Sequence, residues 1–250
     1  MRLLLINPNI SDSVTALIEA EARRVASADT QIACATAPSG VAYIETRFEA
    51  LLGAHAAAQI AAERWREADA VVVAAFGDPG VTALREVLPV PVVGLTEAAL
   101  ATASLLGQRF AIVAISSRIR AWYRECVDGY GYSSRLAAIR ALDRPLGPVG
   151  ELQQAHADRL VELCDEAVRE DGADVVILAG APLAGLARTI RHRIGVPLVD
   201  GVSSAVKQAE TLAALAPGKA RVGSFAAPPV KPHAGLSAAI AALLAGPTSP

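Results

Sequence analysis

Short apolar runs alternate along this chain with longer segments in which apolar residues recur every three or four positions. The short runs contain no alternating polar residues, which is typical of strands buried on both faces of a sheet. The longer segments have the period of helices that bury one face. Alternating strands and helices predict an α/β fold with parallel sheets. The predicted strands span residues 2–6, 31–36, 70–74, 92–95, 110–115, 175–179 and 197–199, with a further short strand near 137–141.

The predicted helices fall between these strands and after the last of them. They are rich in Ala, Leu, Glu and Arg, which have high helix propensity. They span residues 14–27, 48–65, 81–87, 98–106, 118–130, 151–170, 185–194, 202–215 and 235–244.

The two halves of the chain repeat one arrangement. A strand, a turn, a short helix and a second strand introduced by proline occur in residues 71–94 and again in 175–201. We therefore expect two Rossmann-like lobes with parallel sheets, related by a pseudo-twofold axis. The first lobe is predicted to comprise residues 1–96 with the C-terminal segment 203–250, and the second to comprise 97–202.

A turn follows the corresponding strand in each half, at residues 74–80 and 178–183. In the first turn Asp78 is placed to cap the next helix, and Pro79 to occupy its first position, where a missing N–H costs nothing. In the second turn Ala181 has no side-chain oxygen with which to cap a helix. Uncapped N–H groups bind anions or carbonyl oxygens, and capping by solvent is the alternative. Because ligands bind at the carboxyl ends of parallel strands, we predict that the two turns face each other across an interlobe ligand cleft.

Composition argues against two classes of partner. The formal net charge is −2, the pI is near 6.1, and Lys and Arg are scattered, so the basic surface that nucleic acid needs is not expected. No uninterrupted apolar run reaches the roughly 18–20 residues of a membrane span, so no membrane partner is expected either. The N-terminal apolar run is too short for a secretory signal and is interpreted as the first strand. These features together predict a cytoplasmic protein.

The three cysteines, Cys34, Cys126 and Cys164, are odd in number and lack C-x-x-C or metal-ligand spacing, which fits a reducing compartment. We interpret each as a buried, unreactive thiol. The four histidines also lack metal-ligand spacing, and no Gly-x-Gly-x-x-Gly motif follows a strand. We therefore expect neither a metal nor another cofactor.

Five short motifs occur in order along nearly the whole chain. They are Ile6-Asn7-Pro8-Asn9, Ile44-Glu45, Phe76-Gly77-Asp78-Pro79-Gly80, Glu97-Ala98-Ala99 and Val196-Pro197-Leu198-Val199-Asp200-Gly201-Val202. With these motifs the sequence resembles the Asp/Glu/hydantoin racemase superfamily, in its hydantoin and allantoin racemase branch. The resemblance implies two Rossmann-like lobes that bind a hydantoin or a small amino-acid-like ligand between them without cofactor or metal.

The resemblance also shows where this chain departs from the family. In the family one cysteine precedes the Phe-Gly-Asp-Pro-Gly motif and another lies in the later turn, and the two thiols remove and return a proton on opposite faces of the substrate. This chain has Ala75 and Gly180 at those positions. A methyl group and a hydrogen atom do not exchange protons, so the two-thiol mechanism cannot operate there.

The candidate catalytic residues are Glu45 and Asp78. Glu45 lies in a loop rich in Ala, Gly and Pro. If the loop covers the cleft, the carboxylate can transfer a proton, and solvent exposure is the alternative. Asp78 is expected to be a helix cap first and a catalytic acid second.

Further polar residues are candidates for binding the ligand. Asn9 is expected to present its amide to the ligand, and the alternative is that it only shapes its own turn. Ser116 and Ser117 lie near Arg118 at a predicted helix start, and we expect these side chains to bind a carboxylate group of the ligand. The alternative is that a serine only caps the helix. The predicted substrate-binding residues are Asn9, Ala75, Phe76, Gly77, Thr96, Ser116, Ser117, Arg118, Gly180, Ala181 and Pro182.

The expected function is a cofactor-independent enzyme that acts on a hydantoin-like ring or on a small carbamoyl or amino-acid derivative. Three reactions stay open: isomerisation with Glu45 or another non-thiol base, hydrolysis or desulfurisation of a (thio)hydantoin-type ring, and decarboxylation of a small carboxylate. Backbone N–H groups at the two turns would stabilise an enolate or oxyanion, by roughly 3–4 kcal/mol for each donor. The alternative from another class is a non-catalytic protein that binds a ureide or amino acid. The Ala-rich helices favour a homo-oligomer.

Overall fold

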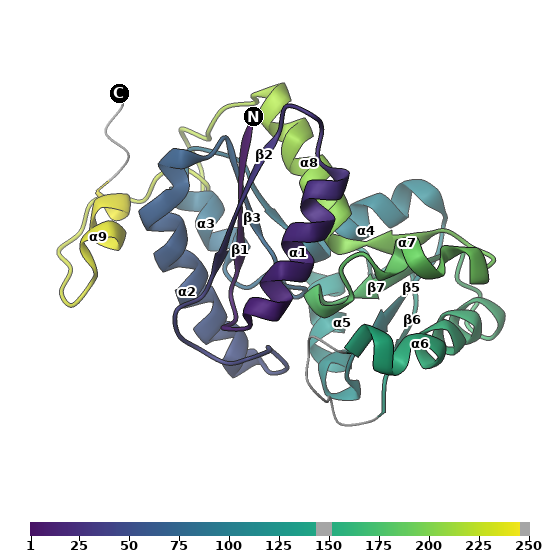
Figure 1. Cartoon of the computed structure of the whole chain (residues 1–250). Helices are drawn as coiled ribbons and strands as arrows, with labels where there is room; N and C mark the ends of the chain where they lie inside the picture. Colours follow the sequence, from purple (N-terminus) through teal and green to yellow (C-terminus); the bar gives the residue numbers. More distant parts are fainter. Residues whose placement is uncertain (144–151, 246–250) are drawn as a thin grey trace.

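The computed structural model describes residues 1–143 and 152–245, which form two four-stranded parallel sheets (Figure 1). The strand order is β2-β1-β3-β4 in the first sheet and β6-β5-β7-β8 in the second, so the two sheets repeat one topology. The predicted α/β class is confirmed. The strands are β1 (Arg2–Asn7), β2 (Gln31–Thr36), β3 (Ala70–Val73), β4 (Val92–Gly94), β5 (Phe110–Ala114), β6 (Leu136–Ala141), β7 (Val175–Ala179) and β8 (Leu198–Asp200).

The predicted helices are present, with ends that differ by a few residues. Residue 151 of the predicted helix 151–170 and residues 246–250 of the predicted first lobe lie outside the described residues. The two sheets lie within the ranges predicted for the two lobes, whose boundaries stay a prediction. The helices are α1 (Asp12–Val25), α2 (Arg47–Arg64), α3 (Val81–Val87), α4 (Leu95–Leu106), α5 (Arg120–Gly129), α6 (Leu152–Arg169), α7 (Leu186–Ile190), α8 (Gly201–Leu215) and α9 (Ala238–Leu244).

Helices α4 and α8 join the two sheets. α4 follows β4 of the first sheet and packs against β7 and β8 of the second, whereas α8 follows β8 and packs against β3 and β4 of the first. The two helices also pack on each other. One hydrophobic core therefore continues from Leu5 and Val72 in the first sheet to Ile112 and Ile177 in the second. Burial of such side chains contributes roughly 1.5–3 kcal/mol each, which stabilises the pairing of the lobes.

The other face of the first sheet is covered by α2, and α9 packs on α2 on the side away from the sheet (Figure 1). The Ser237 hydroxyl at the start of α9 donates a hydrogen bond to Oε1 of Gln59 on α2, at 2.7 Å. Through residues 1–143 and 152–245, no helix is both long and apolar enough to cross a membrane.

Candidate functional site

The turn after β3 is held by a buried carboxylate. Asp78 is 7% exposed, and its two carboxylate oxygens accept the backbone N–H groups of Thr96 at 2.8 Å and Glu97 at 2.9 Å. Asp78 therefore caps α4, and the prediction that it caps the helix after its own turn is wrong. That helix, α3, begins behind Gly80, which has a left-handed φ of +82° and provides no side-chain cap. Pro79 consequently precedes the helix and does not occupy its first position.

In the second lobe a carboxylate also caps the equivalent helix, α8, but it belongs to the residue directly before that helix. Asp200 accepts the N–H groups of Ser203 at 2.9 Å and Gly185 at 2.7 Å, and so caps α8. Gly94, the residue before α4, has backbone angles close to those of Asp200 before α8 (φ −101°, ψ 155° against φ −102°, ψ 129°). A Cβ atom at Gly94 would lie 2.2 Å from Cγ of Asp78. Glycine is needed here because the Asp78 carboxylate already fills this space.

Burial raises the pKa of Asp78 to about 6, and the hydrogen bonds that it accepts, including one from the Tyr130 hydroxyl at 2.9 Å, only partly offset this effect. A raised pKa means that ionisation of Asp78 costs stability. The stability that the protonated Asp78 carboxyl contributes to the folded state is complete below the unfolded pKa near 3.8. This contribution is lost as the pH rises through 6.

We expect this loss to be about 2 kcal/mol between pH 4 and pH 7. The Asp78→Asn variant, which cannot ionise, should lack this part of the pH dependence. Urea unfolding of both proteins across this range measures the difference. Parallel pH profiles for the two proteins would contradict the prediction.

Helix α5 of the second lobe packs against the same turn of the first. The ring of Tyr123 lies 4.7 Å from the ring of Phe76, and Sγ of Cys126 donates to the carbonyl oxygen of Gly77 at 3.8 Å. Gly77 has a φ of +106°, and a Cβ atom there would lie 2.3 Å from the indole ring of Trp122. Because Gly77 has no Cβ atom, the indole ring of Trp122 packs directly against the turn. The turn is therefore a contact between the two lobes.

The turn after β7 is fixed from outside by α6. Gly180 ends the strand with a φ of +118°, and Pro182 follows in the 3-10 helix η5 (Ala181–Leu183). Nε2 of Gln153 donates to the carbonyl oxygens of Pro182 and Ala184, both at 2.9 Å. No side chain caps η5, and the N–H of Ala181 has no acceptor among the described residues. The uncapped donor predicted from the sequence is therefore confirmed.

A narrow cavity lies between the two turns. Phe76 of the first turn and Gly180 of the second both line it, so the structure brings the two predicted turns to one cavity. Ala75, which is buried, is not among its lining residues, and the N–H groups of Ala75 and Phe76 have no acceptor in the described part of the chain. The cavity has about 190 Å³ of empty space and is too narrow for a water molecule, so a ligand fits there only if the cavity widens. The other lining residues are Leu95, Leu178, Ala184, Asp200, Gly201 and Val202.

Asn9 both shapes its turn and keeps a donor. Its Oδ1 accepts the N–H of Ser11 at 2.9 Å and Nδ2 of Asn7 at 3.1 Å, which fixes the orientation of its amide. Within residues 1–143 and 152–245, Nδ2 of Asn9 has no acceptor, and no fully enclosed side-chain nitrogen or oxygen lacks a partner. Nδ2 is therefore open to solvent although the residue is only 5% exposed. Asn7, in contrast, donates to Thr15 and Ser11 and is committed to the turn.

The predicted hydroxyl contacts are largely used within the protein. Thr96 is fully buried, and its Oγ1 accepts the N–H of Gly77 at 2.6 Å. Thr96 and Gly77 therefore hold the turn through this hydrogen bond, and their role as substrate contacts stays a prediction. The Ser116 hydroxyl accepts the N–H of Arg118 at 3.3 Å, as expected for the N-cap alternative. Ser117 and Arg118 are exposed.

Glu45 lies at the boundary between the lobes. Its loop is fixed by a hydrogen bond from the N–H of Ile10 to the carbonyl oxygen of Val41 at 3.0 Å. Close by in the sequence, Arg47 forms an ion pair with Glu125 of α5 in the second lobe. The half-buried Glu45 has no hydrogen-bond partner for its carboxylate among the residues that the structure describes. The first residue of α2 thus contacts the second lobe, and the catalytic role of Glu45 stays a prediction.

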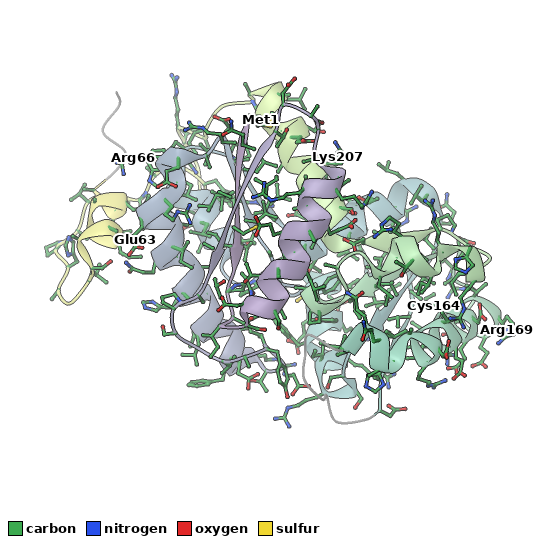
Figure 2. The ribbon with its side chains drawn as sticks, viewed as in Figure 1. Met1, Glu63, Arg66, Cys164, Arg169 and Lys207 are labelled. Carbon is green, nitrogen blue, oxygen red and sulfur yellow. The ribbon has the colours of Figure 1, made fainter. Side chains whose placement is uncertain are left out.

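The three cysteines do not replace the missing thiols. Burial raises the pKa of Cys34, Cys126 and Cys164 to about 12 each, so almost none of the reactive thiolate form exists at neutral pH. Cys34 lies on β2. Cys164 lies on α6 of the second lobe (Figure 2). Cys126 is beside the first turn, but its thiol is engaged by the carbonyl oxygen of Gly77. The raised pKa values fit the predicted unreactive thiols, but only Cys164 is buried, and the prediction that Cys34 and Cys126 are buried is wrong because both are half-buried.

Trp122 and Tyr123 pack against the first turn, and neither is among the residues predicted from the sequence. Both lie within the predicted helix 118–130, where an aromatic pair is usually explained by core packing. The available signal was their rarity, because aromatic residues make up only 4% of the chain. Their helix also follows the central strand β5 at its carboxyl end, where ligands bind in parallel sheets.

Comparison with known proteins identifies the family of this chain. A family model described as Asp/Glu/Hydantoin racemase matches residues 3–209. The chain is 37% identical to the hydantoin racemase of Paenarthrobacter aurescens, over 93% of this chain and all of the relative. Its structure is similar to the allantoin racemase from Klebsiella pneumoniae, with a TM-score of 0.91 and 33% identity over 96% of this chain and 98% of the other. The allantoin racemase from Pseudomonas fluorescens gives a TM-score of 0.85 and 36% identity over 94% and 100%. This chain belongs to the Asp/Glu/hydantoin racemase family.

Proposed function

We propose that this protein is a cofactor-independent enzyme that removes a proton from a ring carbon of a hydantoin-like substrate and uses the Glu45 carboxylate as its base. The observation that carries the proposal is the pair of turns after β3 and β7. They meet at one cavity and keep uncapped N–H groups, while positions 75 and 180 have no acid or base. This arrangement keeps the backbone donors that would bind a planar ligand, but it has neither thiol of the two-thiol mechanism.

The substrate class is supported by the donors around the cavity. A hydantoin-like ring is flat and carries carbonyl oxygens, and the hydantoin and allantoin racemases among the relatives are named for such rings. The N–H groups of Ala75, Phe76 and Ala181 would bind these oxygens once the cavity widens, and Nδ2 of Asn9 would add a further donor. When Glu45 takes the proton, the electron pair of the C–H bond moves to the adjacent carbonyl, and these donors stabilise the enolate that forms.

A single base has a stereochemical consequence. Because the proton leaves and returns on one face of the ring, exchange with solvent should be faster than racemisation. We expect incubation with single enantiomers of 5-substituted hydantoins or allantoin in deuterated water to give α-deuteration by NMR. Chiral chromatography should show slower loss of enantiomeric purity.

The Glu45→Gln variant tests the assigned base. It should lose exchange by about 10²–10⁴-fold, the usual contribution of a positioned acid or base. Glu63→Gln is the matched control, because Glu63 lies on α2 and is hydrogen-bonded to Gln59. Unchanged exchange in Glu45→Gln would contradict the role of Glu45, and racemisation as fast as exchange would contradict the single base.

The second candidate is a non-catalytic protein that binds a ureide or amino acid. It is favoured by the methyl group and hydrogen at positions 75 and 180, together with the raised pKa values of all three thiols. In the same NMR experiment, line broadening without deuteration or a new product would support it. A new product would instead indicate the hydrolytic, desulfurising or decarboxylating alternatives.

A further inference from the structure

Tyr123 is an enclosed side chain with an unsatisfied hydroxyl. The residue is 2% exposed, and its ring lies 4.7 Å from that of Phe76 and 5.6 Å from that of Trp122. Its Oη has no hydrogen-bond partner among residues 1–143 and 152–245, where no fully enclosed side-chain oxygen lacks one. The small exposed part of Tyr123 therefore includes its hydroxyl, which is carried by a ring that packs against Phe76 of the first turn.

The two carboxylates that act on this hydroxyl come from the first lobe. Burial is the main cause that raises the pKa of Tyr123, and the charges of Asp78 and Glu45 raise it further. These two residues belong to the first lobe, on the turn after β3 and on the loop before α2. The packing of Tyr123, on α5 of the second lobe, against Phe76 of the turn after β3 places this side chain at the contact between the lobes. Its hydroxyl stays protonated at neutral pH and can act there only as a hydrogen-bond donor or as an acceptor, not as a base.

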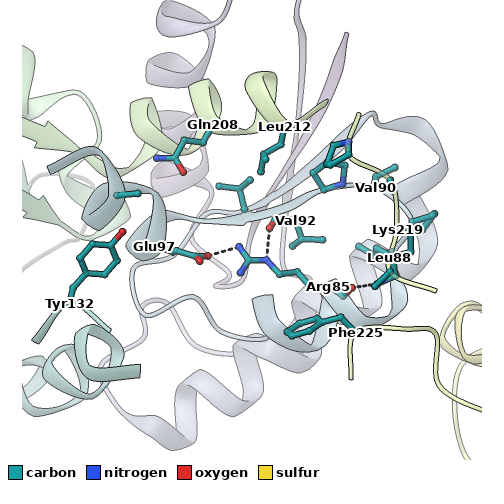
Figure 3. A pocket seen from close by; sticks show the side chains of 17 residues that line it. Arg85, Leu88, Val90, Val92, Glu97, Tyr132, Gln208, Leu212, Lys219 and Phe225 are labelled. Carbon is teal, nitrogen blue, oxygen red and sulfur yellow. Dashed lines mark hydrogen bonds and ion pairs between the residues drawn. The ribbon is translucent and has the colours of Figure 1, made fainter. Parts of the chain in front are cut away.

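The two neighbouring tyrosines differ from Tyr123. The Tyr130 hydroxyl donates to the Asp78 carboxylate at 2.9 Å and so supports the cap of α4. Tyr132 lines another pocket, beside β4, together with Arg85, Glu97 and Phe225 (Figure 3). Of the three, Tyr123 alone combines near-complete burial with an available hydroxyl next to the Phe76 turn.

We propose that Tyr123 is a substrate-binding residue whose hydroxyl donates a hydrogen bond to one ring carbonyl oxygen of the hydantoin-like ligand. The inference rests on the proposed function, and it names a side chain that determines specificity for that carbonyl. The packing of its ring against Phe76 and Trp122 holds the donor in place before the ligand arrives, which reduces the entropic cost of binding.

Calorimetric titration of wild type, Tyr123→Phe and Tyr132→Phe with three ligands tests the proposal. The ligands are hydantoin and its two analogues that each lack one ring carbonyl, 2-imidazolidinone and 4-imidazolidinone. Tyr123→Phe should bind hydantoin about 5- to 30-fold more weakly, as expected when a ligand oxygen loses one donor in a buried site. For the analogue that lacks the recognised carbonyl, wild type and Tyr123→Phe should bind equally. Tyr132→Phe should behave as wild type with every ligand.

The outcomes distinguish a failure of the role assigned to Tyr123 from a failure of the proposed function. If wild type binds hydantoin and Tyr123→Phe binds it equally well, the role of Tyr123 is wrong and the proposed function stands. If Tyr123→Phe loses affinity equally for all three ligands, the hydroxyl does not recognise a particular carbonyl and the inference is overturned. If wild type binds none of the ligands, the proposed function itself fails. Thermal unfolding of Tyr123→Phe should match wild type, because the ring packing is kept.

Discussion

Replacing Ala75 and Gly180 together with cysteine is expected to raise α-proton exchange on hydantoins by about 10²–10⁴-fold and to add racemisation at a comparable rate. One thiol on each turn would restore a proton donor and acceptor on each side of the ring, which a single carboxylate does not provide. Single replacements should increase exchange without a matching increase in racemisation. The measurement is NMR in deuterated water combined with chiral chromatography.

The two positions differ in how readily they accept a side chain. Ala75 already carries a Cβ atom, whereas Gly180 has a φ of +118°, which side chains rarely adopt. A Cβ atom at Gly180 would have its nearest neighbour, Cδ of Pro182, at 3.6 Å, so there is room for it. The backbone strain should nonetheless lower stability by about 1–3 kcal/mol unless the turn relaxes. Unfolding curves of the variants should therefore be recorded with their rates.

The matched control is the double replacement with serine. Serine has nearly the size of cysteine and imposes the same backbone strain, but its hydroxyl does not ionise near neutral pH. It should give no gain in exchange. If the Ala75→Cys/Gly180→Cys protein folds but shows no faster α-proton exchange, the two positions do not face one bound ring. That result would contradict the arrangement of the two turns on which the proposed function depends.

Local sequence patterns were sufficient to predict the fold. Runs such as Ala70–Val73 are short, rich in valine and without polar alternation, which is typical of strands buried on both faces, and the repeat of strand, turn, helix and strand indicated two equivalent sheets. The start of α4 was predicted three residues late, at 98 instead of Leu95. Its cap is Asp78, which is distant in sequence, so no capping residue next to the helix marks its beginning.

The site was predicted only in part for the same reason. The turns that carry Phe76 and Gly180 were identified because strand ends are visible in the sequence, and the structure brings both to one cavity. The roles of Thr96 and Tyr123 depend on contacts between segments far apart in the chain, which periodicity does not report. Asp78 was misplaced because it adopts a positive φ of +49°, an uncommon conformation for a residue other than glycine.

The Gly94→Ala variant is expected to lose about 3 kcal/mol of stability, because the added methyl group occupies the space of the Asp78 carboxylate. The new Cβ atom would lie 2.2 Å from Cγ and 2.4 Å from Oδ2 of Asp78. The carboxylate would have to leave the N–H groups of Thr96 and Glu97, and α4 would lose its cap. Urea unfolding at pH 7 measures the loss, and near-native stability would contradict the explanation given for the glycine.

A compensating pair tests whether the two lobes use equivalent cap positions. Asp78→Gly alone should cost about 1–2 kcal/mol, because the cap is lost while glycine suits the positive φ. Adding Gly94→Asp should recover most of that loss, because the backbone angles before α4 resemble those of Asp200, which caps α8 from this position. Asp78→Gly/Gly94→Ala is the control, which removes the clash without supplying a carboxylate and should stay as unstable as Asp78→Gly. If Gly94→Asp gives no recovery over this control, the position before α4 cannot supply the cap, and the equivalence of the two helix starts is wrong.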